Sequence, residues 1–168
     1  MKEYRVAVVG ALGAVGQEMI KTLERRNFPV KTLKPLDVKE NVGQEVHFRD
    51  QTVKVAESNE KAFENVDIAL FAVANSVSEK LAPAAVTAGC IVIDNSSAWR
   101  MAEGVPLVVP EVNPEALRQH KGLIANPNCS TIIAMVPLKP LHDFAGLKRV
   151  IVSTYQAVSG AGAAGLKE

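Results

Sequence analysis

The chain has 168 residues, of which 48% are hydrophobic and 22% are charged, and its formal net charge at pH 7 is +1. This length suffices for a domain with a sizeable core, and the balance of charge excludes the basic surface typical of nucleic-acid binding. The apolar run near the N-terminus is too short for a signal peptide or a membrane span, so we expect a cytoplasmic protein without membrane partners.

Short apolar runs alternate with helical patterns along the chain. Residues 4–9 (YRVAVV) predict a buried strand, followed by a glycine turn and a helix over residues 14–26. Residues 30–36 predict a weaker strand, and residues 45–57 are typical of a small hairpin or edge pair. The later predicted elements are strands at 67–73, 90–94, 107–110 and 122–125, a helix over 78–88 and a short helix at 114–120.

Apolar strands separated by helices predict a mostly parallel sheet covered on both faces, which is a doubly wound, Rossmann-type α/β fold. Near the C-terminus, residues 147–159 have a long strand pattern that runs into the glycine-rich segment GAGAAGLKE. Such a strand is an unusual end for a domain. We therefore expect a first domain over residues 1–128 and the start of a second, catalytic domain over residues 129–168.

The first strand and helix are joined by a G-x-x-G-x-x-G pattern within VAVVGALGAVGQEMI. Glycines at this junction permit a tight turn and let a diphosphate approach the backbone, where the helix N-terminus offers free N–H groups. A plain tight turn is the alternative reading, but the position of the pattern favours dinucleotide binding. The predicted contacts to the cofactor are Gly10, Leu12, Gly13, Ala14, Val15 and Gly16.

The two cysteines, too few for a disulfide framework, differ in their surroundings. Cys129 lies in ANPNCSTI, where Asn128 or Ser130 is able to cap the helix predicted over 131–138. A cysteine at a helix N-terminus gains thiolate character, although buried inert cysteines are also common. Cys90 begins an apolar strand, which predicts a packing role.

Five motifs together resemble aspartate-semialdehyde dehydrogenase, in the first half of that enzyme. They span nearly the whole chain: GALGAVG (10–16), DNSSAWR (94–100), PLVVPEVN (106–113), NPNCST (126–131) and STYQAVSGAG (153–162). One alternative is N-acetylglutamyl-phosphate reductase, although PNCST favours the aspartyl enzyme. The other alternative is a non-catalytic nucleotide-binding module with a structural Cys129.

The resemblance implies NADPH-dependent reductive dephosphorylation of 4-phospho-L-aspartate to L-aspartate 4-semialdehyde, with release of phosphate, in lysine, threonine and methionine biosynthesis. It implies a homodimer or homotetramer. It makes Cys129 the nucleophile that forms a thioester and assigns substrate contacts to Arg100, Gln156 and Asn128. It places Ser159 and Gly160 near the nicotinamide.

Two departures from the family matter. The acid/base histidine and the arginine for the substrate carboxylate are expected beyond this chain, so this part alone is expected to be inactive. Glu40 and Asn41 stand where relatives place an arginine and a serine for the 2′-phosphate of NADP. NADP is the family cofactor, but NAD is possible here. Asp37, which follows Gly16 by 21 residues, suits a ribose hydroxyl, whereas Lys34 or Lys39 could restore positive charge.

The three histidines, His47, His120 and His142, lie in no recognised motif and are predicted to be surface or packing residues. No cluster of histidine, cysteine and acidic residues has metal-ligand spacing, so no metal is expected.

Overall fold

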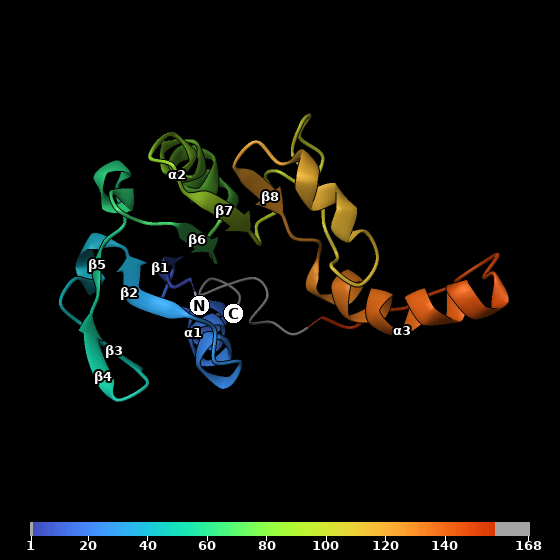
Figure 1. Cartoon of the computed structure of the whole chain (residues 1–168), viewed down its shortest axis with the longest axis horizontal. Coiled ribbons are helices and arrows are strands. Elements are labelled where there is room, and N and C mark those ends of the chain that lie inside the picture. The colour runs from blue at the N-terminus through green and yellow to red at the C-terminus, as the bar shows by residue number, and fades with distance from the viewer. Residues whose placement is uncertain (1, 157–168) are drawn as a thin grey trace.

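The computed structural model describes residues 2–156. Its six-stranded sheet has the order β5-β2-β1-β6-β7-β8, and every neighbouring pair is parallel (Figure 1). The strands are β1 (Tyr4–Val9), β2 (Val30–Asp37), β5 (Ala56–Glu57), β6 (Ile68–Phe71), β7 (Ile91–Asp94) and β8 (Leu123–Ala125), beside a two-stranded sheet of β3 (Glu45–Phe48) and β4 (Gln51–Lys54). The helices are α1 (Ala14–Arg25), α2 (Asn75–Thr87), α3 (Cys129–Ala145) and the 3-10 helices η1 (Lys39–Asn41), η2 (Glu60–Phe63) and η3 (Pro114–Gln119).

The central strand β1 divides the core into two layers. Val8 belongs to the same buried cluster as Ile20 of α1, whereas Val9 belongs to the same cluster as Leu81 of α2. Successive side chains of a strand point to opposite faces, so a continuous apolar strand needs cover on both. Figure 1 shows α1 and α2 on opposite sides of the sheet, which confirms the doubly wound α/β prediction.

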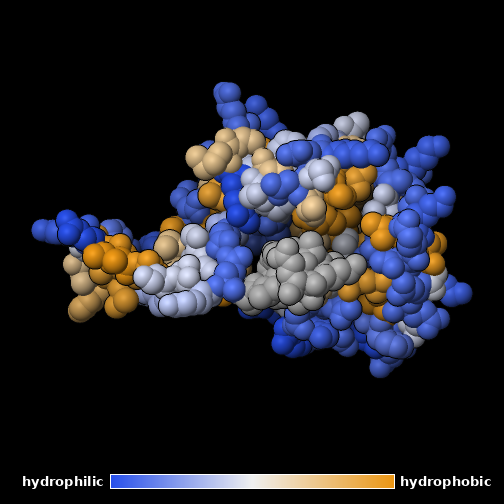
Figure 2. Space-filling view, turned by 180° about the vertical axis from the view of Figure 1, so that it is seen from behind, coloured by the Kyte–Doolittle hydropathy of each residue, from blue (hydrophilic) through white to orange (hydrophobic). Residues whose placement is uncertain are grey.

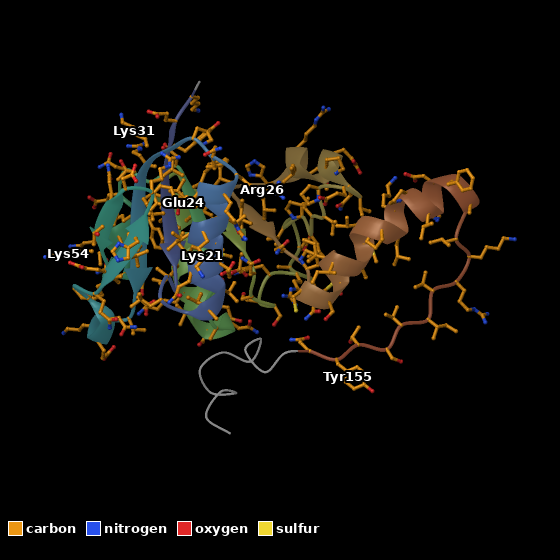
Figure 3. The ribbon with its side chains drawn as sticks, turned by 90° about the horizontal axis from the view of Figure 1, so that it is seen from below. Lys21, Glu24, Arg26, Lys31, Lys54 and Tyr155 are labelled. Carbon is orange, nitrogen blue, oxygen red and sulfur yellow. The ribbon has the colours of Figure 1, made fainter. Side chains whose placement is uncertain are left out.

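Helix α1 buries one face and exposes the other. Gly16 and Ile20 are its buried residues, and Lys21 on the outer face forms an ion pair with Glu18 at 2.8 Å. Figure 3 shows Lys21 and Glu24 on the helix that covers this side of the sheet. The apolar stripe has the helical period, which explains why the prediction for residues 14–26 agrees with the structure to within one residue.

The hairpin prediction for residues 45–57 is confirmed. Strands β3 and β4 pair antiparallel, with Val46 opposite Val53. Val46 and Phe48 are buried in the α1-side cluster, so the hairpin extends the cover on that face. Residues 56–57 form β5, which pairs with the end of β2 at the edge of the main sheet.

The strand predicted at residues 107–110 is wrong. This segment makes a single parallel bridge, between Leu107 and Ala125, beside β8. Pro106 precedes the segment and Pro110 is its last residue, and both lack the N–H group that a longer ladder requires. The pairing therefore stops after one step, with Val108 N–H donating to Ala125 at 3.0 Å and Ala125 N–H to Pro106 at 2.9 Å.

The predictions for the last forty residues need two corrections. Helix α3 continues through Pro137 and Pro140 and ends at Ala145, where Gly146 adopts a left-handed conformation and donates to His142. Residues 147–156 form no strand, although a strand was predicted there. Val150, Ile151 and Val152 are exposed, and no strand of the described chain pairs with them. A strand pattern without a neighbouring strand has nothing to complete its hydrogen bonds.

A bidentate ion pair between Arg5 and Asp67 joins the amino ends of the neighbouring strands β1 and β6. The Arg5 guanidinium donates to both carboxylate oxygens of Asp67, at 2.7 and 3.0 Å, and Arg5 N–H donates at 2.7 Å. The side-chain hydrogen bonds from Arg5 hold the pKa of the Asp67 carboxyl well below its ordinary range. The ionised carboxylate is therefore favoured by folding.

We expect Asp67→Asn to lower the free energy of unfolding near pH 7. Because folding lowers the pKa of Asp67, its contribution is present above the ordinary aspartate pKa of about 4 and is lost as the pH falls below it. Urea unfolding of both proteins at several pH values from 7 to 3 should show their difference shrinking. Asp143→Asn, in an exposed pair with Lys139, is the control and should change little. A difference that grows with acidity would contradict this account.

Candidate functional site

The glycine turn after β1 brings the N-terminus of α1 against the strand. Gly10 has a φ of +80°, and a Cβ there would lie 2.4 Å from the Ala72 carbonyl oxygen. A Cβ on Gly16 would lie 2.1 Å from the Gly10 carbonyl oxygen. Both positions therefore require glycine. Gly13 caps α1 without a side-chain hydrogen bond, and the first turn holds no acidic residue, so this helix end is open to an anion.

The predicted cofactor contacts in this turn differ in their exposure. Gly13, Ala14 and Val15 are exposed, whereas Gly16 is buried beneath them and Leu12 is half-buried. The exposed residues have their backbone at the carboxyl edge of the sheet, next to the point where strand order reverses. That is where dinucleotides bind in doubly wound folds.

Asp37, at the end of β2, is a structural partner of this turn. Its carboxylate accepts from the N–H groups of Leu12 at 3.0 Å and Val38 at 2.9 Å, and from Asn41 Nδ2 at 2.8 Å. Asp37 is buried, and these three bonds commit most of its lone pairs. The distance of Asp37 from Gly16 in the sequence suggested that it binds a ribose hydroxyl. In the structure its hydrogen bonds instead tie the glycine turn to η1.

Glu40 and Asn41 lie in η1, the helix that follows Asp37. Asn41 is bound to Asp37, whereas Glu40 is exposed. Of the two lysines considered for this region, Lys34 donates from Nζ to the carbonyl of Ala62, in η2, at 2.5 Å.

Cys129 is the first residue of α3 and is exposed. Asn128 is the N-cap, and its Oδ1 accepts from Ser130 N–H at 3.0 Å. The other end of the Asn128 amide donates to Gln156 Oε1 at 3.3 Å. The structure thus brings Asn128, Cys129 and Gln156 together, beyond the carboxyl end of β8.

Arg100 ties the loop after β7 to the loop after β8. Its Nε donates to the Asn126 carbonyl at 3.0 Å and its Nη2 to the Asn95 carbonyl at 2.9 Å. Asn126 Nδ2 also donates to Asn95 Oδ1, at 2.6 Å. Nη1 makes no hydrogen bond within residues 2–156, so it is the part of the guanidinium that remains for an anion. Arg100 therefore supports the segment leading to Cys129 whether or not it also contacts a ligand.

A buried carboxylate, which the sequence did not identify, holds this loop in place. Asp94 is fully buried and accepts from Ser78 Oγ at 3.0 Å and from Ser96 Oγ at 2.5 Å. Trp99 Nε1 donates to Ser78 Oγ at 2.9 Å, and Ala98 N–H to Ser96 Oγ at 3.2 Å. The loop that carries Arg100 is therefore anchored to α2.

A second link that the sequence did not reveal lies between the glycine turn and Cys129. Asn75, the first residue of α2, accepts from Ser97 N–H at 3.0 Å and donates from Nδ2 to Ser97 Oγ at 2.8 Å. Helix α2 follows β6, next to the reversal of strand order. The loop after β6 is thereby joined to the loop after β7.

Other predicted residues are placed as follows. His47 is paired with Thr52 at 3.1 Å and His120 accepts from Gly122 N–H at 3.0 Å, so both serve local structure. Ser159 and Gly160 lie outside the described residues. Within residues 2–156, no group of three or more metal-binding side chains is close enough to hold an ion, and no helix has the length and apolar composition to cross a membrane.

Comparisons with known proteins agree with this arrangement. The sequence model of the family described as "Semialdehyde dehydrogenase, NAD binding domain" matches residues 5–120, and that of the "dimerisation domain" matches residues 138–168. The aspartate-semialdehyde dehydrogenase of Bacillus subtilis is 58% identical over 97% of this chain and 47% of its own length. That of Aquifex aeolicus is 54% identical over 98% of this chain and 49% of its own length.

A solved structure of aspartate semialdehyde dehydrogenase II from Vibrio cholerae, complexed with ASA, is also similar. It is 46% identical with a TM-score of 0.93, over 99% of this chain and 50% of that one. The chain thus spans about half the length of the relatives that it matches.

We expect Gly16→Ala to destabilise the protein by about 1–3 kcal/mol, since the added methyl group overlaps the Gly10 carbonyl. Gly13→Ala is the matched control, because its Cβ would lie 3.4 Å from the same oxygen. Denaturant unfolding measures both. Equal losses of stability would show that the close approach of Gly16 to Gly10 is not the constraint we describe.

We expect Cys129 to react with iodoacetamide faster than Cys90 at neutral pH. Cys90 is buried, its pKa is raised by burial, and its Sγ lies 3.3 Å from the Val66 carbonyl. Cys129 is exposed at the start of a helix. Peptide mapping after brief labelling gives both rates, with Cys129→Ser as control. Equal labelling of the folded protein would refute the difference in accessibility.

Proposed function

This chain belongs to the semialdehyde dehydrogenase family, and on that premise we propose that it forms the cofactor-binding part of an aspartate-semialdehyde dehydrogenase. The proposed reaction is reductive dephosphorylation of 4-phospho-L-aspartate to L-aspartate 4-semialdehyde. The observation that carries this proposal is the exposed Cys129 at the start of α3, beyond the same edge of the parallel sheet as the glycine turn.

The residues of the glycine turn fit a dinucleotide. Gly10 and Gly16 allow the helix to approach the strand, and the uncapped N-terminus of α1 offers backbone N–H groups to a diphosphate. When bound, the reduced nicotinamide supplies a hydride. The chain's part is to hold the diphosphate over Gly13, Ala14 and Val15 and so to direct the rest of the cofactor along the sheet edge.

Cys129 is the proposed nucleophile. Its thiolate attacks the acyl carbon of the aspartyl phosphate, the carbon–oxygen bond to phosphate breaks, and a thioester and inorganic phosphate result. Hydride addition to the thioester carbon, followed by loss of the thiolate, gives the aldehyde and restores Cys129. A thioester accepts hydride more readily than a carboxylate does, which is the chemical reason for a cysteine at this position.

Three side chains near Cys129 are proposed to bind substrate. Arg100 has a guanidinium suited to a phosphate, with Nη1 as the group left by its structural hydrogen bonds. Asn128 and Gln156 share a hydrogen bond beside the nucleophile, so they are suited to orient the acyl group together. A substrate that hydrogen-bonds to one of these two side-chain amides would therefore also affect the other.

The remaining assignments are proposals of the same kind. Ser159 and Gly160 are assigned to the nicotinamide, and residues 129–168 to the start of the second, catalytic domain. We place the activity in the lysine, threonine and methionine pathways of the cytoplasm, in a homodimer or homotetramer. The match of residues 138–168 to a dimerisation domain supports association, as do exposed apolar side chains on α3 such as Ile133 and Phe144. Figure 2 shows apolar side chains toward the end of the projecting arm that α3 forms.

NADP is the proposed cofactor. The absence of an arginine at position 40 weakens this choice, and NAD is the alternative. Asp37 offers little support for NAD, because its oxygens already accept hydrogen bonds from Leu12, Val38 and Asn41. The choice between NADP and NAD therefore depends on groups around η1 other than Asp37.

We expect the 168-residue chain to bind NADPH but to show no steady-state turnover of aspartate semialdehyde with phosphate and NADP. An acid/base group contributes about 10²–10⁴-fold to such a reaction, and none of the three histidines is proposed for that role. Energy transfer from Trp99, the one tryptophan in the sequence, to bound NADPH measures binding. Gly13→Val is the matched variant, since the backbone there accepts a side chain that would obstruct the diphosphate.

The nucleophile is tested in the same chain with acetyl phosphate, a minimal acyl phosphate, followed by acid quench and mass spectrometry. We expect the acetyl group on Cys129 in the parent chain and no acetylation of Cys129→Ser. Binding of NADPH without acylation of Cys129 would favour a non-catalytic module. Steady-state turnover by the chain alone would place a general base within it.

A further inference from the structure

Ser78 is a fully buried serine near the start of α2. Its Oγ donates to Asp94 Oδ1 at 3.0 Å and accepts from Trp99 Nε1 at 2.9 Å. A buried hydroxyl is costly unless its hydrogen bonds are made, and both bonds of this hydroxyl go to the end of β7 and the loop that follows it. Ser78 therefore connects α2 to two separate points of that segment.

The two partners of this hydroxyl border the residues that carry and hold the arginine guanidinium. Trp99 directly precedes Arg100, and Asp94 directly precedes Asn95, whose carbonyl accepts from Arg100 Nη2 at 2.9 Å. The Asp94 carbonyl also accepts from Asn126 N–H at 2.8 Å, and the Asn126 carbonyl accepts from Arg100 Nε at 3.0 Å. One hydroxyl thus connects the backbone beside the arginine with the backbone that supplies both of its acceptors.

A closed ring of hydrogen bonds includes the same hydroxyl. Asp94 Oδ2 accepts from Ser96 Oγ at 2.5 Å, and Ser96 Oγ accepts from Ala98 N–H at 3.2 Å. The indole of the next residue, Trp99, returns through Ser78 to the other oxygen of the carboxylate. Ser78 is the member of the ring that lies outside the loop. Its removal therefore opens the ring at Trp99 and leaves the bond between Ser96 and the carboxylate in place.

We propose that Ser78 is a positioning residue: through Trp99 and Asp94 it sets the direction in which Arg100 presents Nη1 to the phosphate of the substrate. This rests on the proposed function, in which Arg100 binds that phosphate. Two hydrogen bonds fix the plane of the guanidinium, so the direction of Nη1 depends on how the acceptor carbonyls lie relative to the backbone of the arginine. A charge-assisted contact of a guanidinium is directional, and a small displacement weakens it. Ser78 itself is buried and acts only through these partners.

The test compares acetylation of Cys129 by acetyl phosphate in the 168-residue chain and in its Ser78→Ala variant. We expect the half-saturating concentration of acetyl phosphate to rise about five- to tenfold, on the scale of one hydrogen bond, while the rate at saturation is unchanged. Alkylation of Cys129 by iodoacetamide should also be unchanged, because this reagent is uncharged and does not require Arg100. A general disturbance around Cys129 would alter all three quantities.

A second variant and a matched control identify the link. Trp99→Phe keeps an aromatic ring against the core but removes the N–H group that Ser78 accepts, so it should raise the half-saturating concentration as Ser78→Ala does. Thr87→Ala is the control, since the exposed Thr87 hydroxyl lies in the same helix and donates to the Pro83 carbonyl at 2.9 Å. It should leave acetylation unchanged. Urea unfolding of each variant verifies that it is folded under the assay conditions.

Arg100→Ala separates a positioning role from a purely structural one. If Ser78 acts through Arg100, Ser78→Ala should cause no further rise in the half-saturating concentration when Arg100 is already alanine. Independent effects that multiply in the double variant, or an unchanged value in Ser78→Ala alone, would overturn the role of Ser78 and leave the proposed function standing. If the parent chain acquired no acetyl group on Cys129, the proposed function itself would fail, and this inference with it.

Discussion

The close approach of Gly16 to the Gly10 carbonyl is the constraint on which the dinucleotide end of this molecule depends. No side chain fits between them, so helix α1 begins directly on the edge of β1. This contact sets the direction of the helix and presents its free N–H groups to the reversal point of the sheet. The hydrogen bond from Leu12 to Asp37 then attaches the turn to the end of β2. One steric requirement thus positions both the N-terminus of α1, where the diphosphate is proposed to bind, and the adjoining end of β2.

The other end of the site is held by hydrogen bonds rather than by close packing. Asp94 is buried and has no cationic partner within residues 2–156, and its carboxylate oxygens accept hydrogen bonds from the hydroxyl groups of Ser78 and Ser96. Burying a carboxylate is costly unless its oxygens are satisfied, so this network has to remain complete. It fixes the loop from which Arg100 reaches the Asn126 carbonyl. The position of Cys129 therefore depends on contacts that begin in α2 and β7, far from it in sequence.

These two ends lie along one edge of a parallel sheet, and that arrangement has a chemical use. All of the loops involved follow the carboxyl ends of strands, so a cofactor held over α1 can extend toward a thiol at the start of α3. Asn75 and Ser97 connect the intervening loops. In the proposed reaction the chain contributes position, an exposed nucleophile and an anion site.

Local patterns in the sequence determined the main sheet, the two helices that cover it, the glycine turn and the placement of Cys129 at a helix start. These features depend on short-range periodicity and on residues such as Gly16 and Asn128, whose roles are set by near neighbours. The tertiary structure alone decided that residues 107–110 and 147–156 are not strands, because a strand exists only where another strand pairs with it. It also decided that Asp37 is committed to Leu12 and that Ser78 links Asp94 to Trp99. Pairing, burial and hydrogen bonding join residues distant in sequence, so no local pattern contains them.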